Sequence, residues 1–172
     1  MKQLDGTGLK RLHRSFRQQV EHDCALILDN VASPFKVGAI ARSAAAYKVA
    51  RVWAAGSTPS FREPKVQKTA LGCDRYFITE SVTTPLDAVA AAHTAGYRVV
   101  AIELADRASP IHQADLSGRV CLLVGHEDRG VVPATLDACD AVAFIPQLGK
   151  IGSLNVATAT AIALWELTRR RL

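Results

Sequence analysis

Three segments of the chain carry residues suited to binding or chemistry, and each follows a short apolar stretch. Asn30 follows CALILD (24–29), and residues 146–155 follow AVAFI (141–145). Gly125 is the last residue of RVCLLVG (119–125), and His126 and Glu127 come directly after it. An amide, a carboxylate and a hydroxyl at such places can orient a ligand, and glycine lets the backbone approach it closely. If the apolar stretches are parallel strands of one sheet, the three segments meet at the edge where such sheets bind ligands.

Arg42 is a further candidate, within the Ala-rich segment PFKVGAIARSAAAY (34–47). A guanidinium near a hydroxyl oxygen favours the developing alkoxide and can hold a neighbouring phosphate through two hydrogen bonds. It is a poor general base, because arginine keeps its proton in proteins. Judged by itself, Arg42 would be a surface arginine on a helix.

The signatures of several common sites are missing from the sequence. No GxGxxG follows an apolar stretch, no GxxxxGK[ST] or GxSxG string occurs, and Ser153 lies in GSLN instead. The five histidines lack metal-ligand spacing, so no metal site is expected, and His126 is expected to be a loop residue. The cysteines lie far apart and are expected to be reduced core thiols: Cys24, Cys73, Cys121 and Cys139.

The elements that position these residues alternate between apolar strands and helices. Strands are predicted at 24–29, 51–56, 75–79, 97–104, 119–125 and 141–146, and helices at 8–22, 34–47, 62–72, 84–96 and 153–171. Nearly continuous apolar strands separated by helices indicate a parallel sheet that is covered on both faces. The sequence therefore predicts an α/β fold.

The length and composition fit one globular domain. The chain has 172 residues, of which 49% are hydrophobic and 22% charged, which excludes a disordered chain. No apolar run reaches the roughly 20 residues that a membrane-spanning helix needs. The N-terminal sequence MKQLDGTGLKRLHRSF has no apolar segment of the secretory type. We therefore expect a cytoplasmic protein without a membrane partner.

The net charge of +5 is unevenly distributed along the chain. Residues 30–76 carry eight lysines and arginines against two acids, whereas residues 77–168 carry five against ten. The predicted helix 8–22 combines an apolar stripe with a basic face, and three arginines stand at 169–171. This pattern favours a polyanionic partner such as nucleic acid, although a solvated basic surface explains the charge equally well.

Taken together, three strings resemble the SpoU (TrmH-like) branch of the SPOUT RNA methyltransferases: DNVASPFKVGAIARSAAAY (29–47), LLVGHEDRGV (122–131) and FIPQLGKIGSLNVATATAIALWE (144–166). KVQKTALGCDRYF (65–77) is also similar to this family. The resemblance implies transfer of a methyl group from S-adenosylmethionine to a ribose 2′-hydroxyl in tRNA or rRNA, with tRNA favoured by the small size of the chain. It also implies a C-terminal deep trefoil knot and a homodimer in which two subunits complete each site. Residues 1–22 would be a basic helical extension of the knotted catalytic domain, 23–172.

The resemblance also assigns roles to single residues. Arg42 matches the catalytic arginine, and Glu127 matches a glutamate that arranges the site. Ser153 and Asn155 lie where the family contacts cofactor and substrate, and Ser153 also suits a helix N-cap. Asn30 is expected to orient Arg42 or the loops around it.

Further positions follow for the two ligands. The cofactor slot would be formed by Ile102, Gly125, Ile145, Leu148, Ser153 and Leu154. RNA would contact Lys36, Arg11, Arg14, Lys65 and Lys68, and the arginine tail would add to this surface. Lys36 is a departure, because many relatives have an asparagine there; its charge suits a phosphate. Methylation of a base nitrogen and a non-catalytic RNA-binding module are the alternative functions.

Overall fold

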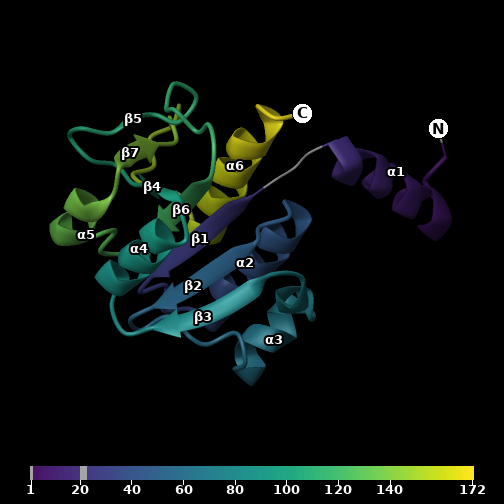
Figure 1. The fold of residues 1–172 in the computed structure, drawn as a ribbon, viewed down its shortest axis with the longest axis horizontal. Coiled ribbons are helices and arrows are strands. Elements are labelled where there is room, and N and C mark those ends of the chain that lie inside the picture. The colour runs from purple at the N-terminus through teal and green to yellow at the C-terminus, as the bar shows by residue number, and fades with distance from the viewer. Residues whose placement is uncertain (1, 20–22) are drawn as a thin grey trace.

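The computed structural model describes residues 2–19 and 23–172. In this part of the chain seven parallel strands form one sheet, in the order β3-β2-β1-β6-β4-β7-β5 (Figure 1). The strands are β1 (Cys24–Asp29), β2 (Arg51–Ala55), β3 (Ile78–Val82), β4 (Arg98–Ile102), β5 (Ser109–Pro110), β6 (Val120–Val124) and β7 (Ala141–Phe144). The parallel α/β sheet expected from the sequence is confirmed.

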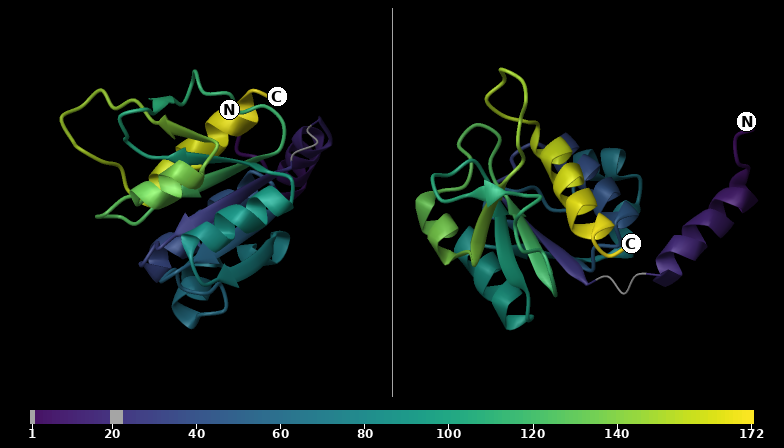
Figure 2. Two further views of the ribbon diagram at one scale, coloured as in Figure 1. Left: turned by 60° about the vertical axis from the view of Figure 1, so that its left-hand side comes forward. Right: turned by 90° about the horizontal axis from the view of Figure 1, so that it is seen from above.

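Helices cover both faces of this sheet, as Figure 2 shows. The described helices are α1 (Gly6–Gln19), α2 (Pro34–Ala46), α3 (Pro64–Ala70), α4 (Pro85–Thr94), α5 (Pro133–Ala138) and α6 (Val156–Arg169), with a 3₁₀ turn at Cys73–Tyr76. Helices α2, α3 and α6 pack on one face of the sheet, and α4 packs on the other.

The alternation of side chains along the strands explains these two layers. In β1, Leu26 and Leu28 belong to the core beneath α2 and α6, whereas Ala25 and Ile27 belong to the core beneath α4. Successive strand residues point to opposite faces, so a strand that is covered on both sides must be apolar throughout. All six residues of β1 are buried, including Asp29 at its carboxyl end.

The predicted strand at 75–79 is displaced. Residues 73–76 form the 3₁₀ turn, and β3 begins only at Ile78. Phe77 turns inward against Phe61, with ring centroids 5.7 Å apart, so it belongs to the core rather than to the strand. The strand β3 lies at the edge of the sheet and its residues are largely exposed, which removes the apolar signal that marks the central strands.

Helix α1 lies to one side of the sheet layers (Figure 1, Figure 2). It begins at Gly6, two residues before the predicted start, and residues 20–22 of the predicted helix lie outside the described part. The apolar stripe exists, but Leu9, Leu12 and Phe16 are 45%, 44% and 49% exposed. None of the described helices combines the length and apolarity that a membrane crossing requires.

All four cysteines are free. Cys24 and Cys121 are buried in the central strands, whereas Cys73 and Cys139 are only partly buried. Burial raises the pKa of Cys24 to about 12, so its thiol stays protonated. The expectation of core thiols therefore fits two of the four positions fully.

Candidate active site

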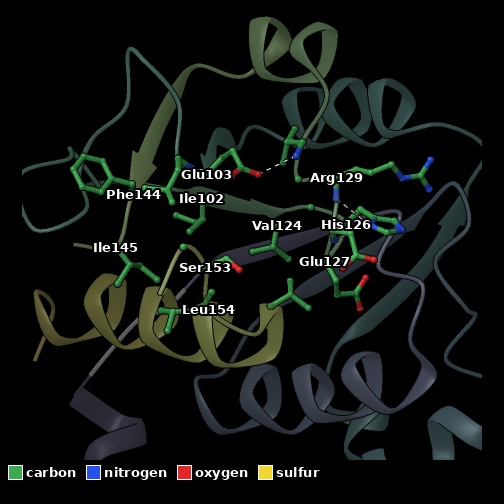
Figure 3. Close-up of a pocket in the computed structure, with 18 of the residues that line it drawn as sticks. Ile102, Glu103, Val124, His126, Glu127, Arg129, Phe144, Ile145, Ser153 and Leu154 are labelled. Atoms are coloured by element: carbon green, nitrogen blue, oxygen red, sulfur yellow. Dashed lines mark hydrogen bonds between the residues drawn. The ribbon is translucent and has the colours of Figure 1, made fainter. Parts of the chain in front are cut away.

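A pocket of about 420 Å³ opens at the carboxyl ends of β4, β6 and β7 (Figure 3). Its walls come from residues 102–104, from the loop 124–131, and from residues 144–159. The expectation that the segments after these strands meet at one edge is confirmed for Gly125-His126-Glu127 and for the stretch 146–155. The reason is topological, because parallel strands all end on the same side of the sheet.

The loop after β6 depends on glycine at position 125. A Cβ on Gly125 would lie 2.6 Å from Val131 Cγ2 and 2.7 Å from the carbonyl carbon of Gly130, so no larger residue fits. The loop closes through the Gly130 N–H, which donates to the His126 carbonyl at 2.9 Å. The His126 ring nitrogen Nδ1 accepts the Asp128 N–H at 3.0 Å. His126 is therefore a structural loop residue, as expected.

The cofactor residues expected from the sequence divide into two groups. The structure brings Ile102, Gly125, Ile145, Ser153 and Leu154 together in the pocket, as Figure 3 shows for most of them. Leu148 lies outside the pocket wall, and its side chain is fully exposed. The neighbouring Gln147 lines the pocket instead. The buried Oε1 of Gln147 has no hydrogen-bond partner among the described residues.

Glu127 is held at the pocket mouth by the start of α2. Its Oε1 lies 3.3 Å from Lys36 Nζ, and its Oε2 accepts the Ala32 N–H at 3.4 Å. Burial by itself would raise the pKa of Glu127, but its own backbone N–H and the Lys36 ammonium outweigh this, so the pKa lies below its usual value. Lys36 thus pairs with a site carboxylate, and its side chain remains 30% exposed.

Asn30 organises a loop. It adopts a left-handed conformation (φ 54°), which asparagine tolerates better than most residues. Its Oδ1 accepts the Ser57 N–H at 2.9 Å and the Ser57 hydroxyl at 3.1 Å, and its amide donates to Asp29 Oδ1 at 2.7 Å. Of the two roles expected for Asn30, these contacts correspond to orienting a loop and not Arg42.

Arg42 lies outside the pocket of its own chain. It sits on α2 with an exposed side chain and makes no hydrogen bond or ion pair with any residue in the described ranges. A single copy of the chain therefore does not bring Arg42 to the pocket.

The start of α6 differs from the prediction. Asn155, directly before the first helical residue, is the N-cap, and its Oδ1 accepts the Ala157 N–H at 2.9 Å. The expectation that Ser153 caps this helix is wrong, because the chain becomes helical only at Val156. Ser153 lies in the preceding loop, exposed and part of the pocket wall.

The basic residues expected to contact RNA fall into two groups, those with exposed side chains and those that bond to other parts of the fold. Arg11, Arg14, Lys65 and Lys68 are exposed. The arginine tail is instead committed to the fold. Arg170 donates to the Ile111 and Ala114 carbonyls at 2.7 and 2.6 Å, and Arg171 to the Gly118 carbonyl at 2.5 Å. These bonds fasten the loop between β5 and β6 to the end of α6.

Several residues of the pocket were not predicted as site residues, among them Glu103, one residue beyond β4, and Gln147, three residues beyond β7. No motif marks them. The only available signal was their position after an apolar strand, which many loop residues share.

Comparison with known proteins identifies the family. Residues 23–165 match the model of the SpoU rRNA methylase family. The chain belongs to the SpoU family. It is 36% identical over 150 residues to the 23S rRNA (guanosine-2'-O-)-methyltransferase RlmB of Acinetobacter baylyi, covering 86% of this chain and 60% of that protein. It is 32% identical to the tRNA (guanosine(18)-2'-O)-methyltransferase of Escherichia coli, covering 87% and 64%. The chain thus spans about three-fifths of the length of these relatives.

Solved structures of the SpoU type share the fold. The SpoU methyltransferase AviRb from Streptomyces viridochromogenes, in complex with AdoMet, has a TM-score of 0.77 and 28% identity, covering 86% of this chain and 60% of that one. A TrmH/SpoU tRNA modifying enzyme from A. aeolicus has a TM-score of 0.78 and 25% identity, covering 95% and 84%.

Proposed function

We propose that this SpoU-family chain is an S-adenosylmethionine-dependent methyltransferase that methylates a ribose 2′-hydroxyl in tRNA or rRNA. The observation that carries the proposal is the pocket built from the loop 124–131 and residues 144–159 in a chain of this family. Relatives are named as guanosine-2′-O-methyltransferases of tRNA and 23S rRNA, and a similar structure contains AdoMet.

The pocket residues fit this cofactor. Its volume of about 420 Å³ lies within the usual range for small-molecule sites. Ile102, Ile145 and Leu154 offer apolar walls for an adenine ring, and Gly125 allows a close approach to the backbone. The buried Oε1 of Gln147 lacks a donor within the described chain, which a ligand amino or hydroxyl group would supply. When bound, S-adenosylmethionine supplies an electrophilic methyl group.

The residues of the chain would then position and activate the hydroxyl. A guanidinium beside the 2′-oxygen stabilises the alkoxide that develops there, and the proton leaves to a phosphate oxygen or to water. Because Arg42 is exposed and outside its own pocket, we assign this role to Arg42 of the partner subunit in a homodimer. Glu127, held by Lys36, and Ser153 line the pocket, and Asn155, the N-cap of α6, would complete the edge of the site.

The proposal includes the finer features of the family fold. These are a C-terminal trefoil knot, a cytoplasmic location, and residues 1–22 as an RNA-contacting extension of the domain 23–172. The sheet order is compatible with the knot, because β6 lies between β1 and β4 while β7 lies on the far side of β4. The exposed Arg11, Arg14, Lys65 and Lys68 would contact the RNA backbone, together with the partly buried Lys36.

The proposed activity is tested by determining which atom of the RNA is methylated. Purified protein, S-adenosylmethionine and transcripts of tRNA and 23S rRNA should yield a 2′-O-methyl nucleotide, mapped by mass spectrometry and absent from the RNA of cells lacking the gene. A methylated base nitrogen would show that the protein is a base methyltransferase and would overturn the proposed ribose methylation. Cofactor binding without any methylated product from either RNA would favour a non-catalytic RNA-binding protein.

The trans arrangement of Arg42 has its own test. Arg42→Ala and Ser153→Arg should each be inactive, the first for lack of the guanidinium and the second because its pocket is blocked. In mixed dimers, the Arg42→Ala subunit retains a pocket and receives an intact Arg42 from the other subunit. Random mixing at equal concentration should therefore restore about a quarter of the wild-type activity per subunit. No recovery after confirmed subunit exchange would mean that Arg42 acts within its own chain.

A further inference from the structure

Glu103 is a pocket carboxylate to which neither the sequence motifs nor the proposed reaction gives a role. It follows β4 directly and lies in the pocket wall, pointing toward the loop after β6 (Figure 3). Its Oε2 accepts the Val131 N–H at 2.9 Å, and its Oε1 accepts the Leu104 N–H at 2.8 Å. The carboxylate is therefore fixed in place by two backbone donors from different segments.

The neighbouring loop leaves room for this carboxylate. Gly130 has φ 63°, and a Cβ on it would lie 2.5 Å from Glu103 Oε2. Any other residue at 130 would therefore push the carboxylate away and would also be strained in the left-handed conformation. The close fit joins the ends of β4 and β6 around the pocket.

The charge of Glu103 is not neutralised by the protein. Within the described residues no lysine, arginine or histidine forms an ion pair with it, whereas Glu127, on the other side of the loop, is paired with Lys36. Each carboxylate oxygen has two lone pairs, and each accepts one backbone N–H. Glu103 thus places a carboxylate without a cationic partner, and with free acceptor capacity, at the pocket wall.

We propose that Glu103 is a specificity residue that makes the pocket prefer a cationic cofactor to its neutral product. The inference rests on the proposed function. S-adenosylmethionine carries a sulfonium charge that S-adenosylhomocysteine lacks, while the adenosine and amino-acid parts are the same. A fixed carboxylate in a partly enclosed site attracts the sulfonium form selectively, because charges interact more strongly there than in water. The product, once formed, loses this attraction and leaves more easily.

The experiment compares the two ligands on the full-length protein by titration calorimetry. Glu103→Gln removes the carboxylate charge and preserves the size of the side chain. It should weaken the binding of S-adenosylmethionine about tenfold but that of S-adenosylhomocysteine no more than about twofold. Glu103→Asp, which retains the charge, should keep most of the preference. Asp106→Asn removes an exposed charge of the same connecting loop outside the pocket, and should change neither affinity.

The outcomes separate charge from loop positioning. Equal weakening of both ligands by Glu103→Gln would show that the residue merely holds the loop, and would overturn the inference, as would unchanged affinities. Thermal unfolding of the unliganded variants checks that each is folded, and Glu103→Asp provides the second route if Glu103→Gln is unstable. If the wild-type protein binds neither ligand, the proposed function itself fails. Equal weakening leaves the proposed function intact.

Discussion

The two edges of the sheet use the same kinds of residue in opposite ways. At the amino ends of the strands, Tyr97 donates its hydroxyl to Asp23, and Arg119 lies 2.5 Å from Asp23 and above the Tyr97 ring. Asp140 accepts the Val99 N–H at 2.7 Å and contacts His93 at 2.8 Å. These polar groups are paired with one another.

At the carboxyl ends, polar atoms are left without partners from the described chain. Asp29 is 2% exposed, yet its Oδ2 has no hydrogen-bond partner there, and the same holds for Gln147 Oε1. Glu103 keeps an unpaired charge, and the loop after β6 has glycines at 125 and 130. Buried polar atoms without partners lower the free energy of unfolding, so they are retained where a ligand satisfies them. The paired groups named at the amino edge contribute to stability, whereas the unpartnered atoms named at the carboxyl edge are available to a ligand.

The largest expected effect is on ligand binding at the carboxyl edge. Ser153→Arg should reduce S-adenosylmethionine affinity by at least about 100-fold, because the long side chain would fill a small pocket. The unfolding temperature should stay the same, because Ser153 is an exposed loop residue. Titration calorimetry measures the first and thermal unfolding the second.

Ser117→Arg is the matched control at the amino edge, where Ser117 donates to Asp115 at 2.6 Å. It should leave the cofactor affinity unchanged. Unchanged binding in Ser153→Arg would refute the assignment of binding to the carboxyl edge.

A smaller effect is expected on stability at the amino edge. Tyr97→Phe removes the hydroxyl that donates to Asp23 but keeps the ring that packs on Trp53, 6.1 Å away. The free energy of unfolding should fall by about 1 kcal/mol, the usual value of such a hydrogen bond. Denaturant unfolding measures this loss. Cofactor affinity should not change. A Tyr97→Phe variant that lost cofactor affinity but kept its stability would contradict the comparison, because it would place binding at the amino edge.

The smallest expected effect is on the unfolding temperature, which substitutions of two aspartates should change in opposite directions. Burial raises the pKa of Asp29 despite the amide of Asn30, so ionisation destabilises the folded chain. Burial also opposes ionisation of Asp140, but the Val99 N–H and His93 outweigh it, and the pKa of Asp140 is lowered. Asp29→Asn should therefore raise the unfolding temperature at neutral pH, and Asp140→Asn should lower it, each by roughly 1–3 °C.

The pH dependence distinguishes the two. The destabilisation caused by ionised Asp29 develops as pH rises from the pKa of the unfolded state through the higher pKa of the folded state. The increase in unfolding temperature expected for Asp29→Asn should therefore vanish in acid. The Asp140 contribution is present above its unfolded pKa and is lost as pH falls through the lower folded pKa. Thermal unfolding from pH 3 to 7 measures both. Shifts of the same sign at neutral pH would contradict the comparison.

Local patterns were enough for the elements with strong signals. The buried strands at 24–29 and 119–125 are nearly continuous apolar runs, and the structure places them within one residue of the predicted bounds. The two-residue strand β5 and the six-residue helix α5 were not predicted, because elements so short leave no periodicity to detect. The N-cap of α6 was missed for a similar reason, since Ser153 and Asn155 are both good caps and only the chain path selects between them.

The sequence by itself determined the alternation of strands and helices and the residues that end the central strands, because burial on both faces and tight turns constrain residue type locally. Only the tertiary structure decided which charges meet. Arg170 and Arg171, expected at an RNA surface, bond carbonyls more than 50 residues away, and Lys36 pairs with Glu127. Partners so distant along the chain leave no trace in local spacing, since folding alone brings them within a few ångströms.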